Sequence, residues 1–431
     1  MCAVYRAKVA TGTYDVALAM RPPRRIRSGR RVTVFFNPGG PGGSAVDYLA
    51  SDPPELRRLD DVSILTFDPP GTGQTSPATC GRSNAPERLA GTVIDTADPA
   101  ALKGFVESST GFARACRNGA ARGEGAGSAT AADVMEAVRM AVGEPTVNFL
   151  GFSYGTALGL DYVARYPSGV GRFVLDGVVP LTMGLKELTD GQAISLEAAL
   201  GAFLTRCAAP PCPAADAGAT ARIDSLFAAA ATVPMRSGSS ALSGARLTYA
   251  LGIGVAEKAN WSRLETALDA ASHGDPRLLL EMSDQAEGRL LHGGHSDLLA
   301  QYYAVVCSDH VGPSTVESII DDVSELRRSA PHFAELAILN APCLSWRSPG
   351  VPAPAPTHVR SGSVTILSAE LDPLSPTSWA GRMHAADATS VLVTWQGIGH
   401  LAYVNSPCAR QIANGILDGF SSGPSHDTVC Q

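Results

Sequence analysis

The stretch TVNFLGFSYGTALGLDYVARY (146–166) decides the fold of this chain. It opens with an apolar run that has the length and composition of a buried strand, and it closes with apolar residues at helical spacing. Between the two stands GFSYG (151–155), which matches the G-x-S-x-G pattern of a sharp strand-to-helix turn that exposes a serine hydroxyl. This pattern predicts that Ser153 is a nucleophile. The alternative is an ordinary small polar residue in a turn.

Strands and helices alternate on both sides of this stretch. The sequence predicts further strands at 13–20, 32–37, 61–68, 172–179, 363–372 and 390–395, and helices at 131–142, 377–386 and 406–419. Buried apolar strands separated by helices are typical of a mostly parallel central sheet with helices on both faces. We therefore expect an α/β protein whose active-site residues lie at the carboxyl ends of the strands.

A region of different composition interrupts this alternation. Residues 181–305 are rich in Ala, helical in pattern and broken by loops such as CAAPPCPAADAG (207–218), with no clear buried strand. This pattern indicates an inserted, mainly helical cap. The predicted organisation is an N-terminal part of the core at 1–180, the cap at 181–305 and a C-terminal part of the core at 306–431.

Two further strand ends carry the residues that a serine nucleophile requires. A serine hydroxyl needs an imidazole to accept its proton and a carboxylate to orient that imidazole. The segment LSAELDPLSP (367–376) supplies Asp372, with Glu370 as a substitute, and LVTWQGIGHLAY (392–403) supplies His400. The chain order Ser, Asp, His is that of the α/β hydrolases. The alternatives are a turn aspartate before proline and an ordinary loop histidine.

The glycine-rich loop NPGGPGGS (37–44) follows another predicted strand. An acyl-transfer intermediate carries an oxyanion, which two backbone N–H groups commonly stabilise. We expect one N–H from Tyr154, the residue after the nucleophile, and the other from a glycine of this loop. A plain Gly/Pro turn is the alternative.

Charge and composition exclude several classes of function. The net charge of −7 and the absence of a broad basic surface argue against nucleic acid as a partner, and RPPRRIRSGRR (21–31) reads as a solvated loop. No apolar stretch is long enough to span a membrane. No cofactor is predicted. The segment HGGHSD (292–297) brings His292, His295 and Asp297 together, but a cap loop explains it better than a metal site.

Nine cysteines stand without the paired CxxC spacing of a zinc site, and they favour an oxidising compartment. Pairing of neighbours along the sequence leaves Cys2 single, whereas buried free thiols in a cytoplasmic enzyme are the alternative. The expected disulfides are Cys80–Cys116, Cys207–Cys212, Cys307–Cys343 and Cys408–Cys430. The N-terminus lacks the pattern of a signal peptide, so a secreted or periplasmic location implies a leader removed before this numbering.

The motifs together resemble the serine aminopeptidases, which include the proline iminopeptidases, and more closely the secreted bacterial tripeptidyl aminopeptidases with a TAP-like C-terminal segment. The resemblance spans nearly the whole chain and is carried by FFNPGGPGGSAVDYL (35–49), FDPPGTGQTSP (67–77), NFLGFSYGTALGLDYVARYPSGVGRFVLDGVV (148–179), VVCSDH (305–310), ILSAELDPLSP (366–376) and GIGHLAY (397–403).

This resemblance implies an α/β-hydrolase fold with a helical cap, hydrolysis through an acyl-enzyme, and export with disulfides. It matches Ser153, Asp372 and His400 to a catalytic triad, and Gly40 to the loop glycine that offers an oxyanion N–H beside Tyr154. The chain departs from the family's pattern in two places. Pro70 stands where the family usually has Arg, and Asn37 with Pro38 replaces the His of the proline iminopeptidases.

An aminopeptidase must also hold a free α-amino group, which calls for carboxylates in the cap. Glu187, Glu197 and Asp190 are candidates by position, and solvated cap residues are the simpler interpretation. The expected activity is release of short peptides, of tripeptidyl type, or of single residues from peptide N-termini. The alternatives are an esterase, lactonase or amidase on a small molecule and a noncatalytic binding module. The expected assembly is a monomer or a small homo-oligomer.

Overall fold

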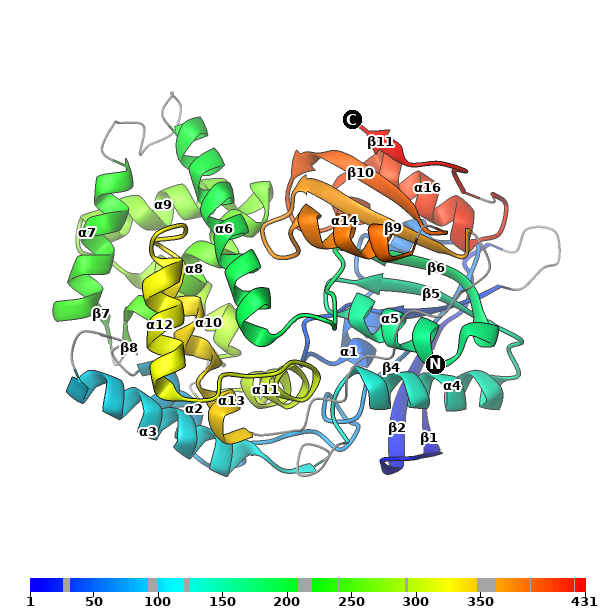
Figure 1. Cartoon of the computed structure of the whole chain (residues 1–431), viewed down its shortest axis with the longest axis horizontal. Helices are drawn as coiled ribbons and strands as arrows, with labels where there is room; N and C mark the ends of the chain where they lie inside the picture. Colours follow the sequence, from blue (N-terminus) through cyan, green and yellow to red (C-terminus); the bar gives the residue numbers. More distant parts are fainter. Residues whose placement is uncertain are drawn as a thin grey trace.

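The structure, a computed structural model, describes residues 1–25, 32–91, 99–119, 125–207, 219–238, 240–290, 294–346, 362–387, 389–421 and 423–431. A nine-stranded sheet with the order β1-β2-β4-β3-β5-β6-β9-β10-β11 lies in the right-hand part of the molecule as drawn in Figure 1. The strands are β1 (Cys2–Val9), β2 (Gly12–Arg21), β3 (Thr33–Asn37), β4 (Ser63–Phe67), β5 (Val147–Phe152), β6 (Val170–Asp176), β9 (Val364–Leu371), β10 (Val391–Ile398) and β11 (Thr428–Cys430).

The sheet is antiparallel only at one end. β2 pairs antiparallel with both β1 and β4, whereas every pair from β4 to β11 is parallel. The predicted mostly parallel sheet is therefore confirmed. Because parallel strands need a crossover between them, the helices fall on the two faces of the sheet.

Helices cover both faces because neighbouring residues of each strand are apolar and point in opposite directions. Phe35 and Phe149 pack with α4 (Ser128–Val142), α5 (Gly155–Arg165) and α14 (Thr377–Ala386). The adjacent Phe36 and Leu150 pack on the other face with α1 (Ala45–Ala50), α15 (Ala402–Asn405) and α16 (Pro407–Leu417). The strands are thus buried from both sides, as their continuous apolar sequences predict.

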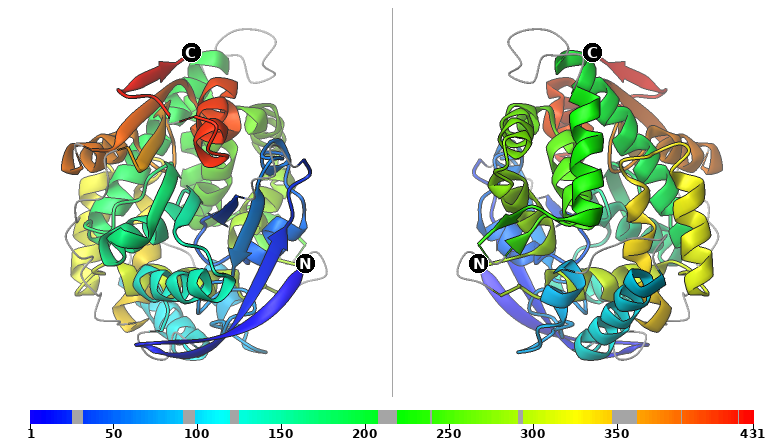
Figure 2. Two further views of the ribbon diagram at one scale, coloured as in Figure 1. Left: turned by 90° about the vertical axis from the view of Figure 1, so that its right-hand side faces the viewer. Right: turned by 90° about the vertical axis from the view of Figure 1, so that its left-hand side faces the viewer.

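A helical region lies beside the sheet, between β6 and β9 in the chain (Figures 1 and 2). It has its own apolar core, which also includes residues of two helices that precede α4. The remaining elements are α2 (Ala85–Gly91), α3 (Pro99–Cys116), α6 (Leu185–Cys207), α7 (Ala219–Thr232), β7 (Arg236–Ser237), β8 (Ser240–Ala241), α8 (Gly244–Ala256), α9 (Trp261–Ser272), α10 (Arg277–Glu287), α11 (Leu298–Asp309), α12 (Val316–Leu326), α13 (Pro342–Trp346), and the short 3₁₀ turns η1 (Leu56–Arg58), η3 (Pro167–Gly169), η4 (Lys258–Asn260), η5 (Ala334–Leu336) and η6 (Ile338–Asn340).

Disulfides tie helix ends to neighbouring segments of the described chain. They join Cys80 to Cys116, Cys307 of α11 to Cys343 of α13, and Cys408 of α16 to Cys430 of β11. Cys2 is exposed and makes no disulfide in the described part of the chain. The expected pair Cys207–Cys212 lies outside the described side chains. Closing loops of this length stabilises a fold by about 2–4 kcal/mol per disulfide.

None of the helices in the described part of the chain combines the length and the apolar character needed to cross a membrane.

Asp161 is a buried carboxyl group on α5. It is only 4% exposed, and its Oδ1 has no hydrogen-bond partner among the described residues. Burial raises the pKa of Asp161 to about 7, and the Asp309 carboxylate contributes to the rise while Arg165 opposes it. A carboxyl group whose pKa is higher in the folded than in the unfolded chain stabilises the fold at low pH. That contribution is lost as the pH rises through the folded pKa.

Asp161→Asn is therefore expected to flatten the dependence of stability on pH. A rise of about three pKa units corresponds to a loss of about 4 kcal/mol of wild-type unfolding free energy between about pH 4 and pH 8. Because Asn stays neutral, the variant should lack this decline and should be more stable than the wild type at about pH 8. Urea titrations at several pH values measure the difference. Asp15→Asn, at an exposed position, is the control, and an unchanged slope in Asp161→Asn would contradict the prediction.

Candidate active site

Ser153 lies at the sharp turn that its sequence pattern predicts. β5 ends at Phe152 and α5 begins at Gly155, and Ser153 between them has a φ of 51°, in the left-handed region that residues with a side chain rarely adopt. Its N–H donates to the backbone oxygen of Asp176 at 2.8 Å. A Cβ at Gly155 would lie 2.5 Å from the backbone oxygen of Asn37, so only glycine fits there. Backbone strain of this kind, maintained by the surrounding structure, is common at functional sites.

His400 and Asp372 form a hydrogen-bonded pair at the ends of β10 and β9. Nδ1 of His400 lies 2.9 Å from Oδ1 and 3.1 Å from Oδ2 of Asp372, whose side chain is fully buried. The same carboxylate accepts the backbone N–H groups of Leu374 at 2.9 Å, Ser375 at 2.8 Å and Leu401 at 3.2 Å. These donors fix the orientation of the carboxylate, and it in turn orients the imidazole. Glu370, the substitute that the sequence left open, is exposed.

The order of the strands brings the serine and histidine turns to one edge of the sheet. β5, β6, β9 and β10 are consecutive parallel neighbours, so their carboxyl ends lie together (Figure 1). The end of β6 contacts both turns. Asp176 accepts the N–H of Ser153, and a Cβ added at the next residue, Gly177, would lie 3.3 Å from Cε1 of His400.

The carboxylate of Asp176 is a further buried group that the sequence analysis missed. It accepts the N–H groups of Ala402 at 3.0 Å and Tyr403 at 2.7 Å, at the start of α15. Burial raises its pKa to about 7 although these two hydrogen bonds oppose the rise. Asp176 therefore fixes the segment just after His400. Asp176 is the last residue of β6, and a carboxylate within an otherwise apolar run is the sequence signal that could have found it.

The charges around His400 favour its protonated form. Burial by itself would lower the pKa of His400, but the carboxylate of Asp372, with smaller contributions from Glu257 and Asp176, raises it above the usual value. This arrangement stabilises the imidazolium that forms when a histidine accepts the proton of a serine.

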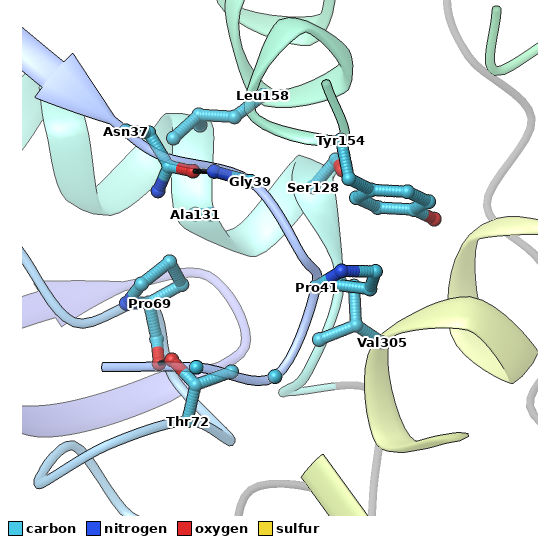
Figure 3. Close-up of a pocket in the computed structure, with 13 residues that line it drawn as sticks. Asn37, Gly39, Pro41, Pro69, Thr72, Ser128, Ala131, Tyr154, Leu158 and Val305 are labelled. Carbon is cyan, nitrogen blue, oxygen red and sulfur yellow. Dashed lines mark hydrogen bonds between the residues drawn. The ribbon is translucent and has the colours of Figure 1, made fainter. Parts of the chain in front are cut away.

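The glycine-rich loop passes directly against the serine turn. A Cβ at Gly39 would lie 2.3 Å from the backbone oxygen of Phe152 and 2.9 Å from the backbone nitrogen of Tyr154. The N–H of Gly39 donates to Oδ1 of Asn37 at 2.9 Å, a bond drawn in Figure 3. Because Asn37 occupies the N–H of Gly39, Gly40 stays the loop residue that we expect to offer an N–H to an oxyanion. The N–H of Tyr154 lies at the start of α5, where helix geometry leaves backbone donors without an intrahelical partner.

A partly buried aspartate anchors the side chain of Tyr154. The Tyr154 hydroxyl donates to Oδ2 of Asp309 at 2.9 Å, and Asp309 also accepts the N–H of Ser128 at 2.8 Å and its hydroxyl at 2.7 Å. Tyr154 and Ser128 border a cavity of about 30 Å³ beside the loop, whose wall also includes Pro41 (Figure 3). Asp309 belongs to the motif VVCSDH (305–310), so this motif supports the turn that carries Ser153.

The cap carboxylates predicted from position are paired elsewhere. Glu187 accepts a hydrogen bond from Arg382 of α14 at 2.6 Å. Oε1 of Glu197 lies 2.6 Å from Nδ1 of His332, and Nε2 of the same ring lies 3.0 Å from Oδ1 of Asp224. Neither carboxylate is among the described residues that line the cavity of about 410 Å³ beside the loop at Gly40.

Glu257 is the carboxyl group of the helical region that lies against the histidine turn. It follows α8, pairs with Gly399 in a β-bridge and accepts a hydrogen bond from Asn405 at 3.1 Å. The N–H of His400 donates to the backbone oxygen of Ala256 at 3.0 Å. Burial raises the pKa of Glu257 to about 7, although the positive charge of His400 and the bond from Asn405 oppose the rise. The sequence analysis missed Glu257 because nothing local marks its contact with residue 400.

Glu257→Gln is expected to shift the acid limb of activity to lower pH. His400 faces the carboxyl groups of Asp372, Glu257 and Asp176, and all three raise its pKa. Removing one of these charges lowers the pKa of His400, so the neutral, proton-accepting form persists by about 0.5 pH unit further into acid. Profiles of kcat/KM against pH on a neutral ester measure the shift. Glu281→Gln, at an exposed position on α10, is the matched control, and coincident acid limbs would contradict the prediction.

Within the described residues no cluster of three His, Cys, Asp or Glu side chains could hold a metal ion. His295 of the HGGHSD segment contacts Glu87 at 3.2 Å, and Asp297 accepts the N–H of Cys80 at 2.8 Å. His292 lies outside the described residues. The two described side chains thus contact Glu87 of α2 and the backbone of Cys80 before that helix.

Two known protein families match parts of this chain. The family described as "alpha/beta hydrolase fold" matches residues 32–214, and the family described as "TAP-like protein" matches residues 331–430. The chain has the α/β-hydrolase fold, and its C-terminal part is similar to the TAP-like family. The fold class and the family resemblance expected from the sequence are confirmed.

Several curated proteins are similar to the chain over most of its length. It is 26% identical to Tripeptidyl aminopeptidase of Streptomyces coelicolor, covering 94% of this chain and 77% of that protein. It is 28% identical to Carboxylesterase B of Mycobacterium tuberculosis, covering 90% and 78%, and 24% identical to Serine protease Hip1 of the same organism, covering 91% and 80%. The crystal structure of proline iminopeptidase from Mycobacterium smegmatis is 14% identical, with coverage of 97% and 99% and a TM-score of 0.41. The chain is a hydrolase.

Proposed function

We propose that the protein is a serine hydrolase that cleaves short peptides, of tripeptidyl type, or single residues from peptide N-termini. The observation that carries the proposal is the buried Asp372–His400 pair at the strand edge where Ser153 occupies its strained turn. The similarity to a protein named tripeptidyl aminopeptidase supports the choice of substrate.

In this reaction Ser153, His400 and Asp372 act together as a catalytic triad. Oγ of Ser153 bonds to the carbonyl carbon of the scissile amide while His400 accepts the hydroxyl proton, and Asp372 stabilises the imidazolium. The N–H groups of Gly40 and Tyr154 stabilise the oxyanion. The C–N bond then breaks, and His400 delivers its proton to the departing amine. Water attacks the acyl ester by the same route, which returns the serine.

Recognition of the substrate's α-amino group requires a carboxylate near these residues. Glu187 and Glu197 would have to leave Arg382 and His332 in order to bind it. Glu257 lies against the histidine turn and accepts a hydrogen bond from the neutral side-chain amide of Asn405. We therefore favour Glu257 as the anchor of the ammonium group, and keep Glu187 and Glu197 as the weaker candidates.

The test compares substrates with free and blocked N-termini. Tripeptidyl and aminoacyl p-nitroanilides should be cleaved at least about 100-fold faster than their acetylated forms, because a buried carboxylate without its ammonium partner is costly. Glu257→Gln should narrow this ratio, whereas Glu281→Gln should preserve it. Equal rates on free and blocked substrates would reject the aminopeptidase proposal.

An esterase acting on a small acyl substrate is the second candidate. Two observations favour it: the 28% identity to a protein named Carboxylesterase B, and the apolar wall of the cavity beside Gly40. Hydrolysis of simple p-nitrophenyl esters with no measurable cleavage of any peptide amide would select this candidate over the first.

We also propose that the protein is exported, as a monomer or small homo-oligomer. The disulfides within the described residues support an oxidising compartment, since cytosolic thiols are normally kept reduced. Mass spectrometry of an unreduced digest would detect the cross-linked peptides, and free thiols throughout would reject export. Light scattering measures the size of the assembly.

A further inference from the structure

A cavity of about 410 Å³ lies between the helical region and the proposed oxyanion loop. Its wall comes from α6, α8, α10, α11 and the η5–η6 segment, and the same wall includes Gly40 and Leu374. Gly40 is the proposed oxyanion donor, and the N–H of Leu374 binds the carboxylate of Asp372. The cavity therefore reaches the proposed reacting groups, and its volume is in the usual range for a small-molecule site.

The wall of this cavity is apolar and uncharged. None of the described residues that line it is Asp, Glu, Lys, Arg or His. Aliphatic and aromatic side chains form most of the surface: Leu196, Tyr249, Ile253, Leu298, Leu299, Tyr302, Tyr303, Leu336, Leu339 and Leu374. A charged group that entered would lose its hydration without gaining an opposite charge, which is strongly unfavourable.

Most polar side chains of the wall already have partners within the protein. Nε2 of Gln192 donates to the backbone oxygen of Leu374 at 3.0 Å, and Nδ2 of Asn340 donates to Oγ1 of Thr189 at 2.7 Å. The hydroxyl of Tyr303 donates to the backbone oxygen of Leu339 at 2.6 Å. Such groups offer few hydrogen bonds to a ligand, so apolar contact dominates what the cavity can bind.

The tyrosines of the wall stay uncharged as well. Burial raises the pKa of Tyr302 to about 12 and raises the pKa values of Tyr249 and Tyr303 still further. At any working pH they contribute aromatic surface without negative charge.

We infer that this cavity is the subsite for the acyl side of the substrate and that it takes a large, apolar, uncharged side chain. The inference rests on the proposed function, because it assigns the cavity to the part of the substrate that precedes the scissile bond. The substrates are then peptides with an aliphatic or aromatic residue at one of the positions before that bond, and not peptides with a charged residue there.

Paired substrates that differ by one terminal ammonium group test the inference. Tripeptidyl p-nitroanilides with free N-termini carry norleucine or lysine at one of the three positions in turn. At one position at least, kcat/KM should be about 100-fold higher for norleucine, because the lysine ammonium would be buried unpaired. In a parallel series of p-nitrophenyl esters from acetate to octanoate, kcat/KM should rise about fourfold per methylene until the cavity is full. A lysine substrate that equals norleucine at all three positions, or a flat ester series, overturns the inference.

Gly252 of α8 allows the cavity to be filled by mutation. It lines the cavity, and a Cβ added there would meet its nearest neighbours, Leu196 and Phe333, only at 4.0 Å. Gly252→Leu should lower kcat/KM for octanoate by about 10-fold or more while changing that for acetate by less than about twofold. Gly252→Ala, which adds one methyl group without a clash, should show the same trend to a smaller degree. An equal loss of kcat/KM on the acetate and octanoate esters, or no loss on either, would contradict the assignment of the acyl subsite to this cavity.

Gly201→Leu is the matched control. Gly201 lies on the exposed side of α6, and a Cβ there would meet nothing within 4 Å, so the same side chain is added away from the cavity. The ester series of this variant should match the wild type. The proposed aminopeptidase activity and the proposed acyl subsite can fail separately. Equal cleavage of free and acetylated peptides rejects the aminopeptidase activity. The ratio of kcat/KM for norleucine and lysine substrates, together with the ester series, still tests the cavity.

Discussion

Ser153→Ala is expected to lower kcat on both tripeptidyl amides and p-nitrophenyl esters on the order of 10⁶-fold. Without the hydroxyl no acyl-enzyme forms, and only the binding and oxyanion contributions remain. The fold should survive because the contacts of residue 153 with its neighbours are made by its backbone: the N–H donates to Asp176, and the oxygen accepts the hydroxyl of Thr156 at 2.6 Å.

Covalent labelling separates the nucleophile from a structural serine. A fluorophosphonate should attach to one serine of the wild type, located by mass spectrometry of the digest, and should not attach to Ser153→Ala. Ser168→Ala, at an exposed position in the turn after α5, is the control and should label and hydrolyse as the wild type does. If Ser153→Ala kept more than about one part in a thousand of the activity, the assignment of the nucleophile would fall.

The sheet could be predicted because most of its strands show a recognisable pattern in their own local sequence. Runs such as TVNFL and SVTIL are mostly apolar, as is typical of strands buried on both faces, and β5 (Val147–Phe152) and β9 (Val364–Leu371) form there. The edge strand β11 (Thr428–Cys430) was missed, since its three residues are too few for a pattern. Its place depends on pairing with β10, which is a contact between distant segments.

The candidate site was predictable only where a residue follows a strand directly. Ser153, Asp372 and His400 stand at or within a few residues of the ends of predicted strands, so parallel topology alone brings their turns to one edge. Asn37 shows the limit of this reasoning. That its side chain accepts the N–H of Gly39, and so removes this group from the candidate oxyanion donors, is a contact that no spacing indicates.

Contacts between the helical region and the core were beyond prediction for the same reason. Glu187, Glu197 and Glu257 all stand in helical surroundings with similar local sequence signals. Which of them faces the histidine turn depends on how the helices pack, and the bridge between Glu257 and Gly399 joins segments far apart in the chain. Packing also decides that Arg382 neutralises Glu187.

Asp372→Asn is expected to lower kcat about 10⁴-fold without unfolding the protein. The carboxylate accepts hydrogen bonds from Nδ1 of His400 and from the N–H groups of Leu374, Ser375 and Leu401. An amide has one oxygen and one NH₂ group, so it cannot accept from all of these donors. If its oxygen keeps the backbone donors, its NH₂ faces Nδ1, which then carries no proton. The proton moves to the other ring nitrogen, the one that must accept the proton of Ser153.

Steady-state kinetics and the rate of fluorophosphonate labelling measure this effect together, since both depend on the same proton transfer from Ser153. They should fall in parallel in Asp372→Asn, while the thermal midpoint stays within a few degrees of the wild type. Glu370→Gln makes the same chemical change two residues earlier, at an exposed position on the same strand, and should leave both rates unaltered. An Asp372→Asn variant within about tenfold of the wild type would show that the histidine does not depend on this carboxylate for its tautomer.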